Sequence, residues 1–381
     1  MKITGFELFR VAPRWLFLRV DTDEGISGWG EPIVEGRAET VAAAVGELFD
    51  YLVGADPMRI EHHWQTMAKA GFYRGGPVLS SALAGIDQAL WDIKGKALNL
   101  PVYELLGGYV RDKVRIYGWL RGDTTAELVE SAQAQVSVGL SAVKMNPWGL
   151  VSGLDTAQRV HEIVDRAAAV REAIGSGRDF AIDFHGRFTS GMVRRVLPLL
   201  EPLLPMFAEE PLLPEYSSQL DRIAASTSIP IATGERLFSR WEFDPVLRSG
   251  IAVAQPDLSH AGGISECRRI AAAAETHDVL VAPHCPLGPI AFAASLQLDF
   301  ATPNFLIQEQ SLGLGYHPDS ERLGYLADDS VLASTDGYIS RPLGPGLGIE
   351  IDEEVVRRAA ADPHRWRNPV WHHADGSLGS W

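Results

Sequence analysis

The chain has 381 residues, of which 46% are hydrophobic and 22% are charged, a composition typical of a globular protein. Its formal net charge of −15 argues against nucleic acid or an anionic membrane as a partner, because both bind a basic face. We see no apolar run of about 18 residues and no signal peptide, and two cysteines cannot form a disulfide framework, so we expect a protein of the reducing cytoplasm.

The first part of the chain is predicted to form strands followed by helices. Two apolar segments within residues 3–32 predict strands, with a turn at residues 23–25. Residues 78–99 carry apolar side chains at steps of three and four, the spacing of one helical face, namely Leu83, Ile86, Leu90 and Ile93. A glycine-rich segment ends at residue 112, so we predict an α+β domain over residues 1–112.

Eight short apolar runs alternate with helical stretches over residues 113–335: VRIYGWL, SAVKMN, DFAIDFH, PMFAEEP, IPIATGE, IAVAQPD, VLVAPHC and FLIQEQ. This alternation predicts a parallel (β/α)₈ barrel. An open doubly wound sheet is the alternative, which the missing glycine fingerprint after an early strand disfavours. Residues 336–381 are rich in glycine and proline and lack periodicity, and we expect them to pack back on the N-terminal part.

Polar residues stand at the ends of these runs, 22 to 27 residues apart: Asp183, Glu209, Glu235, Asp257, His284 and Glu309. In a barrel such positions share the C-terminal rim, where active sites are built. Three carboxylates brought together repel one another unless a cation lies between them, and a set of oxygen ligands suits Mg²⁺. We therefore predict a magnesium site formed by Asp183, Glu209 and Glu235. Glu210 is an alternative to Glu209, and helix capping or a pair of Glu235 with Arg236 is the alternative to metal binding.

Two histidines belong to the same predicted rim. His185 follows Asp183 by two residues, which would place both on one face of a strand, and His284 ends the seventh run. Imidazole suits acid and base catalysis because its pKa lies near neutrality. We expect Asp257 to accept the N–H of His284 and to orient its ring, or alternatively to cap the next helix. A purely structural role is the alternative for each histidine.

Further polar candidates end the second and eighth runs. Lys144 is a candidate donor to a substrate carboxylate, or else an ion-pair partner of the acids, and Asn146 is a neutral hydrogen-bonding residue. We expect Glu309 either to donate a hydrogen bond to a developing enediolate oxygen or to buttress the rim. Cys285 is expected to be a small apolar neighbour of His284, and neither it nor Cys267 has the surroundings of a nucleophile.

The chain resembles the mandelate racemase-like subgroup of the enolase superfamily, and within it the dehydratases that act on D-galactonate. Motifs that carry this resemblance run in order along nearly the whole chain, among them RWLFLRVDTDEGISGWGEP, GFYRGGP, AIDFHGR, GERLFSR, QPDLSHAGGI, APHCPLGPIA and RNPVWHH. The resemblance implies an α+β capping domain, made from both termini, over a modified barrel. It implies Mg²⁺ at the three acids, a base formed by His284 with Asp257, and His185 as the acid that releases a hydroxyl as water.

The resemblance also implies specificity residues and an activity. Two cap loops that close the site would correspond to residues 14–17 and 71–77, so Arg14, Tyr73 and Arg74 are candidates, with an ordinary surface role as the alternative. Racemases of the subgroup end the second strand in Lys-x-Lys, whereas Asn146 stands here, which favours elimination.

We therefore expect an acid-sugar dehydratase, with D-galactonate as the foremost substrate, that forms a 2-keto-3-deoxy acid. Dehydration of another sugar acid, racemisation or epimerisation, and a metal-stabilised binding protein without catalysis are the alternatives. The resemblance further implies a homo-oligomer, with octamers common among such relatives.

Overall fold

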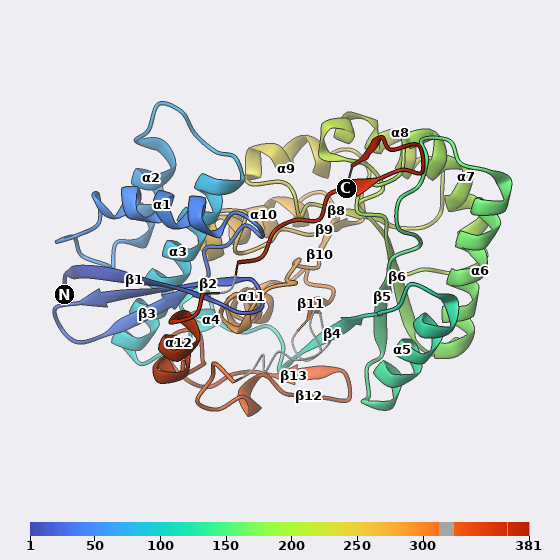
Figure 1. Cartoon of the computed structure of the whole chain (residues 1–381). Coiled ribbons are helices and arrows are strands. Elements are labelled where there is room, and N and C mark those ends of the chain that lie inside the picture. Colours follow the sequence, from blue (N-terminus) through green and yellow to red (C-terminus); the bar gives the residue numbers. More distant parts are fainter. Residues whose placement is uncertain (312–323, 364, 381) are drawn as a thin grey trace.

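The computed structural model describes residues 1–311, 324–363 and 365–380. Figure 1 shows a blue to cyan N-terminal part beside a larger green to orange part. The first part begins with an antiparallel sheet in the order β1-β2-β3. Its strands are β1 (Ile3–Val11), β2 (Trp15–Thr22) and β3 (Ser27–Gly30), and its helices are α1 (Ala38–Phe49), α2 (Ile60–Lys69), α3 (Pro77–Leu98) and α4 (Val102–Leu105).

Helix α3 packs against β3 at very short range. A Cβ atom on Gly30 would lie 1.9 Å from the carbonyl oxygen of Gly85, and one on Gly28 would lie 2.2 Å from that of Ala89. The helix and the strand therefore meet backbone to backbone, which only glycine permits. The four residues that predicted the apolar face of this helix are all buried, as expected.

The second part is the predicted barrel. Its strands are β4 (Lys113–Trp119), β5 (Ala142–Met145), β6 (Asp179–Asp183), β7 (Ala208–Glu209), β8 (Ile231–Thr233), β9 (Val253–Ala254), β10 (Leu280–Val281) and β11 (Gln308–Gln310), one within each of the eight predicted runs. Strands β4 to β10 pair in parallel in chain order, and β11 pairs with β4. A parallel bridge between Val281 and Phe305 joins β10 to the segment before β11, so the ring closes.

Helices on the outside of this ring connect the strands, as the alternation predicts. They are α5 (Thr125–Ser137), α6 (Ala157–Ile174), α7 (Ser190–Leu200), α8 (Leu220–Ala224), α9 (Arg240–Leu247), α10 (Gly263–Glu275) and α11 (Pro289–Ala301), with short 3₁₀ turns η1 (Glu201–Leu203) and η2 (Pro214–Gln219). Side-chain hydroxyls start several of them, and Thr124 forms a reciprocal capping box with Glu127 at α5. None of the helices described is long and apolar enough to cross a membrane.

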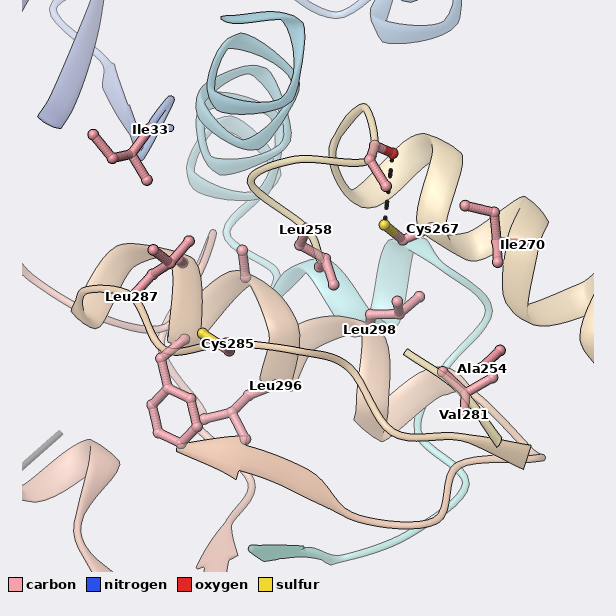
Figure 2. Packing of buried hydrophobic residues seen from close by; sticks show 14 of the residues in the cluster. Ile33, Ala254, Leu258, Cys267, Ile270, Val281, Cys285, Leu287, Leu296 and Leu298 are labelled. Carbon is pink, nitrogen blue, oxygen red and sulfur yellow. Dashed lines mark hydrogen bonds between the residues drawn. The ribbon is translucent and has the colours of Figure 1, made fainter. Parts of the chain in front are cut away.

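Two cysteines lie in the core between the barrel helices. Figure 2 shows Cys267 and Cys285 among leucine and isoleucine side chains, with the Cys267 thiol directed at a backbone carbonyl. Both are free thiols, and burial raises the pKa of each well above its usual value. Cys285 is therefore the small apolar residue that the sequence predicts, and the buried Cys267 behaves in the same way.

The C-terminal segment contacts both parts of the molecule. It comprises η3 (Ser330–Leu332), β12 (Ser334–Thr335), β13 (Tyr338–Ser340), α12 (Glu353–Ala360), β14 (Trp371–His372) and β15 (Leu378–Gly379). Helix α12 lies beside β1, where Arg357 pairs with Glu7 at 2.8 Å, as the expected packing on the N-terminal part requires. The red trace in Figure 1 then crosses to the barrel, where Gly379 meets Leu150. This second contact was not expected.

Polar side chains of the N-terminal part begin two barrel helices. Glu31 accepts hydrogen bonds from the main-chain N–H groups of Gly288 and Ala291 at the start of α11. Asp87 of α3 accepts from the N–H and the hydroxyl of Ser265 in the first turn of α10. Burial raises the pKa of the Glu31 carboxyl to about 8 even though the two amides oppose the rise. These contacts fix the N-terminal part over one end of the barrel.

Replacement of Glu31 by alanine is expected to destabilise the whole molecule. Two amides in a fully buried site would lose their acceptor, at a cost of about 1–3 kcal/mol each. Chemical unfolding followed by far-ultraviolet circular dichroism measures the loss. The matched control is Glu130→Ala on the exposed face of α5, which we expect to change the free energy of unfolding by less than about 0.5 kcal/mol. Equal effects of the two substitutions would contradict this role of Glu31.

Candidate active site

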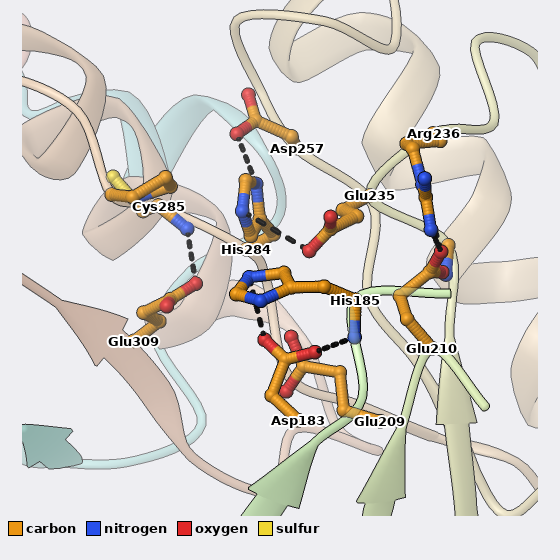
Figure 3. Close-up of polar contacts among 12 residues, drawn as sticks. Asp183, His185, Glu209, Glu210, Glu235, Arg236, Asp257, His284, Cys285 and Glu309 are labelled. Carbon is orange, nitrogen blue, oxygen red and sulfur yellow. Dashed lines mark hydrogen bonds and ion pairs between the residues drawn. The ribbon is translucent and has the colours of Figure 1, made fainter. Parts of the chain in front are cut away.

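Three carboxylates meet at the C-terminal ends of neighbouring barrel strands. Asp183 and Glu209 are the last residues of β6 and β7 and pair in register, and Glu235 lies two residues beyond β8. Each offers one oxygen, and these atoms all lie within 4.8 Å of one another. Figure 3 shows the group above the arrowheads of the strands. The structure thus brings together the three residues that the sequence predicted as metal ligands.

The electrostatics of this group suit a divalent cation. Burial, together with repulsion among the acids, raises the pKa of Asp183 and of Glu235, the latter to about 7, and raises that of Glu209 well above its usual value. The buried oxygen Oε2 of Glu209 has no hydrogen-bond partner in the part of the chain that the structure describes. A hard cation with oxygen ligands would occupy this position and relieve the repulsion.

Glu210 is turned away from this group. Its carboxylate accepts hydrogen bonds from the Gly234 amide at 3.0 Å and from Nη2 of Arg236 at 2.7 Å. Arg236 therefore pairs with Glu210, and the alternative in which it pairs with Glu235 is not what the structure describes. Of the two adjacent acids, the geometry favours Glu209 as the ligand.

Lys144 lies beneath the acids and is fully buried. Its Nζ is 2.6 Å from Glu209, 3.0 Å from Glu309 and 3.7 Å from the Asp183 carboxylate. Burial opposes its charge, but these carboxylates outweigh burial and hold the pKa of Lys144 well above its usual value. The ion-pair interpretation of Lys144 therefore describes this structure, and its charge lies next to the predicted metal site.

His284 and Asp257 form the predicted pair. Nδ1 of His284 lies 2.7 Å from Oδ2 of Asp257, and Nε2 lies 3.3 Å from Glu235. Asp257 is held in turn by the amides of Ser259 and His260, whereas α10 begins only at Gly263, so it does not cap that helix. Burial lowers the pKa of His284, but Glu235, Glu309 and Asp257 outweigh it and raise that pKa well above its usual value.

His185 lies in the site, but a turn and not the predicted strand places it there. Strand β6 ends at Asp183, and His185 adopts a left-handed conformation with φ of 50°, so strand alternation does not place it. The turn brings Nε2 back to 3.1 Å from Asp183, and the ring stacks on Trp119 at 5.5 Å with an interplanar angle of 5°. Burial, Arg187 and Lys144 lower the pKa of His185 well below its usual value. His185 is therefore close to Asp183, as expected, but strand alternation was the wrong reason for that expectation.

Glu309 is the middle residue of β11 and acts as an acceptor. It accepts from the Cys285 amide at 2.9 Å and from the indole N–H of Trp119, in addition to its contact with Lys144. Burial favours its neutral form, but the charges of Lys144 and His284 prevail and lower its pKa. An ionised Glu309 cannot donate a hydrogen bond, so the structure favours the buttressing alternative for this residue.

A pocket of about 790 Å³ opens above these groups between the two parts of the molecule. Arg14 and Asn146 line it, and the buried Oδ1 of Asn146 lacks a hydrogen-bond partner among the residues that the structure describes. Tyr73 and Arg74 were expected here, but they lie outside it. Tyr73 is 87% exposed, and Arg74 donates a hydrogen bond to the Gly71 carbonyl of its own loop.

The same pocket contains residues that the sequence did not single out. Trp119 is the last residue of β4, so its place at a strand end was an available signal. His260 and Glu35 lie on connecting loops, and Trp366 and Trp371 come from the C-terminal segment. The sequence pattern of the barrel strands does not indicate that these four residues belong to the site, because only the packing of distant segments brings them to the pocket.

Both parts of the chain are similar in sequence to known proteins. Residues 10–107 match the N-terminal domain model of mandelate racemase / muconate lactonizing enzyme, and residues 127–355 match the enolase C-terminal domain-like model. The chain is 53% identical to a D-galactonate dehydratase of Variovorax paradoxus and to one of Ralstonia pickettii, over 100% of each chain.

Solved structures agree with these similarities. An enolase from Agrobacterium radiobacter, whose crystal structure holds Na and L-malate, has a TM-score of 0.90 at 32% identity and covers 99% of both chains. A mandelate racemase/muconate lactonizing enzyme from Jannaschia has a TM-score of 0.88 at 30% identity over 100% of both chains. The predicted capped barrel is therefore confirmed in its architecture.

Proposed function

The chain belongs to the mandelate racemase / muconate lactonizing enzyme family of the enolase superfamily, and on this premise we propose that it is a Mg²⁺-dependent sugar-acid dehydratase acting on D-galactonate. One observation carries the proposal. Two imidazoles lie beside a single acidic triad, with Nε2 of His284 3.3 Å from Glu235 and Nε2 of His185 3.1 Å from Asp183. An elimination of water requires one group that takes a proton and one that gives a proton, and two imidazoles can fill these roles.

The reaction begins with removal of the proton on carbon 2, which is weakly acidic because it lies beside a carboxylate. A bound Mg²⁺ supplies positive charge that stabilises the resulting enediolate. Nε2 of His284 takes the proton, since its Nδ1 is bound to Asp257. Lys144 adds a fixed positive charge close to the forming anion.

The second step breaks the bond between carbon 3 and its hydroxyl group. His185, whose Nε2 lies 3.1 Å from Asp183, gives a proton to that hydroxyl, which leaves as water. The enol that remains becomes a 2-keto-3-deoxy acid by tautomerisation. Asn146 at the end of β5 supplies no second base, which supports elimination over racemisation.

The proposal also covers the domain boundaries, the metal ligands, the cellular location and the assembly. We assign residues 1–112 and 336–381 to a cap and residues 113–335 to the catalytic barrel, although residues 312–323, 364 and 381 lie outside the described chain. Asp183, Glu209 and Glu235 are assigned as Mg²⁺ ligands. A cytoplasmic location and a homo-oligomeric assembly accompany this assignment, and size-exclusion chromatography with light scattering tests the second.

A substrate survey tests the proposed function. The purified protein with Mg²⁺ is incubated with hexonates and pentonates, and 2-keto-3-deoxy acids are measured by carbonyl derivatisation. We expect the highest kcat/KM with D-galactonate and a loss of about 10²–10⁴-fold in keto-acid formation in the His284→Asn variant. No turnover of any sugar acid would refute the proposal, and recovery of both carbon-2 stereoisomers without loss of water would indicate a racemase instead.

A further inference from the structure

A second pocket, of about 560 Å³, lies where the start of α1 meets the C-terminal segment. Residues 36–40 and residues 365–370 line it, together with Arg10 of β1. The two segments are in contact, since Nδ2 of Asn368 lies 3.4 Å from the Glu35 carbonyl oxygen. The described lining includes none of the metal-binding acids and neither catalytic histidine. It shares three residues with the pocket above the acids, namely Arg14, Trp366 and Asn368.

Positive charge dominates this second pocket, which we call the basic pocket. Its described lining holds one acid, Glu39, and five arginines, namely Arg10, Arg14, Arg37, Arg365 and Arg367. Arg14 pairs with Glu35, which lies outside the basic pocket. The four other arginines against the one carboxylate of Glu39 leave a net charge of +3, in a chain whose total charge is −15.

Glu39 satisfies only part of this arginine cluster. It lies 2.8 Å from Nη1 of Arg10 and 3.5 Å from Nη2 of Arg365. The hydrogen bond from Arg10 and the charges of Arg365 and Arg367 lower the pKa of Glu39, so its carboxylate is ionised at neutral pH. The positive charge that remains is therefore what an approaching ligand meets.

Several donors in the basic pocket have no acceptor. The guanidinium groups of Arg37 and Arg367 form no hydrogen bond within the described chain, and neither does the buried Nε of Arg10. Arg37 is also the N-cap of α1, a helix of 12 residues, and its side chain makes no capping hydrogen bond. The first-turn N–H groups of α1 lie at residues 38–40, which line the pocket, and the helix dipole adds partial positive charge there.

These donors match a phosphate group better than a carboxylate. A guanidinium presents a planar fork of N–H groups that pairs with phosphate oxygens, and a helix N-terminus favours the same group. A phosphate monoester carries about two negative charges and three terminal oxygens, whereas a carboxylate carries one charge and two oxygens. The pocket is as large as ordinary small-molecule sites of about 300–1,000 Å³, so it has room for an organic body beside Trp366, Pro369 and Val370.

We propose that the basic pocket binds a small organic phosphate monoester through Arg10, Arg37, Arg365 and Arg367 and the start of α1. This binding site goes beyond the proposed function, because it uses none of the residues assigned to the dehydration. It can therefore be tested by binding alone, whatever the enzyme turns over. Because Trp366 and Asn368 line both pockets, the bound compound lies next to the sugar-acid pocket.

Isothermal titration calorimetry of the Mg²⁺-loaded protein tests the site, with D-glucose 6-phosphate as the probe. We expect saturable binding that weakens as salt is added, because the contacts are between charges. D-Glucose should not bind, since it lacks the phosphate, and inorganic phosphate should bind more weakly, since it leaves much of the pocket empty. Absence of saturable binding would overturn the site, and equal affinities for inorganic phosphate and D-glucose 6-phosphate would overturn the assignment of an organic phosphate.

Substitutions in the lining locate the binding. Arg37→Gln and Arg367→Gln should each weaken it about tenfold, the effect of losing one hydrogen bond to a charged group. Both should leave kcat/KM for D-galactonate unchanged, because neither arginine lines the pocket above the acids. Glu39→Gln removes a negative charge and should tighten binding, a result that damage to the fold could not produce.

The matched control is Arg268→Gln, an exposed arginine of α10 outside the basic pocket, and we expect it to leave the affinity unchanged. Equal losses in the control and in Arg37→Gln would mean that the whole surface attracts the probe, and they would overturn the site. Binding that survives both Arg37→Gln and Arg367→Gln would place the phosphate elsewhere, at the active-site metal for example, and would overturn the site as well.

Discussion

Replacement of His284 by asparagine is expected to lower dehydration of D-galactonate by about 10²–10⁴-fold and to abolish exchange of the carbon-2 hydrogen with solvent deuterium. Both effects have one cause, because His284 is the group whose Nε2 faces the reacting side of the site while Asp257 holds its Nδ1 at 2.7 Å. Proton nuclear magnetic resonance of substrate recovered from deuterated buffer measures the exchange, and keto-acid formation measures the dehydration.

The matched substitution His185→Asn is expected to separate the two reactions. Dehydration should fall by a similar factor, since the hydroxyl loses its proton donor, but exchange at carbon 2 should persist because His284 still forms the enediolate and returns deuterium to it. His62→Asn, on the exposed surface of α2, serves as the control and should change neither reaction. If His185→Asn loses exchange and His284→Asn keeps it, the two roles are reversed.

Removal of the metal ion is the second large effect. Dialysis against a chelator is expected to abolish dehydration, and Mg²⁺ should restore it and raise the melting temperature. The rise follows because the cation binds only where Asp183, Glu209 and Glu235 are assembled, and a ligand at 100 times its Kd stabilises the fold by about 2.7 kcal/mol. Differential scanning fluorimetry with increasing Mg²⁺ measures the shift.

The adjacent acids Glu209 and Glu210 provide an internal comparison. Glu209→Gln should remove the Mg²⁺-dependent shift together with activity. Glu210→Gln should keep the shift, although loss of its pairing with Arg236 lowers the starting stability. If the shift survives Glu209→Gln and disappears in Glu210→Gln, the metal ligand is Glu210 and not Glu209. Full activity of the chelated protein would exclude a role of the metal in the reaction.

The barrel was predictable because its strands are buried on both faces. Strands covered on both faces appear in the sequence as short continuous apolar runs, and all eight runs contain a strand. Parallel strands also end at one rim, so the polar residue at the end of each run could be assigned to the site from its position along the chain. That reasoning holds for Asp183 and Glu209, which are themselves the last residues of their strands.

Reasoning from strand alternation failed where the chain leaves the sheet. His185 lies in a left-handed turn followed by Gly186, also with positive φ, and the glycine was a sign that the strand does not continue. Tyr73 was placed by resemblance to a cap loop, but its side chain is 87% exposed, so packing against the barrel does not hold it in the pocket. Glu35 and His260 were missed because each is an isolated polar residue on a loop, and only the docking of the cap brings them to one wall.

The polar junction between cap and barrel limits which caps this barrel could accept. Because Glu31 and Asp87 of the cap complete the first turns of α11 and α10, a chimera that exchanges caps must carry acids at both positions or leave buried amides of the recipient barrel unpaired. The cap also supplies Arg14 and Glu35 to the pocket wall. Exchange of the cap would therefore change the pocket wall and the stability of the barrel together.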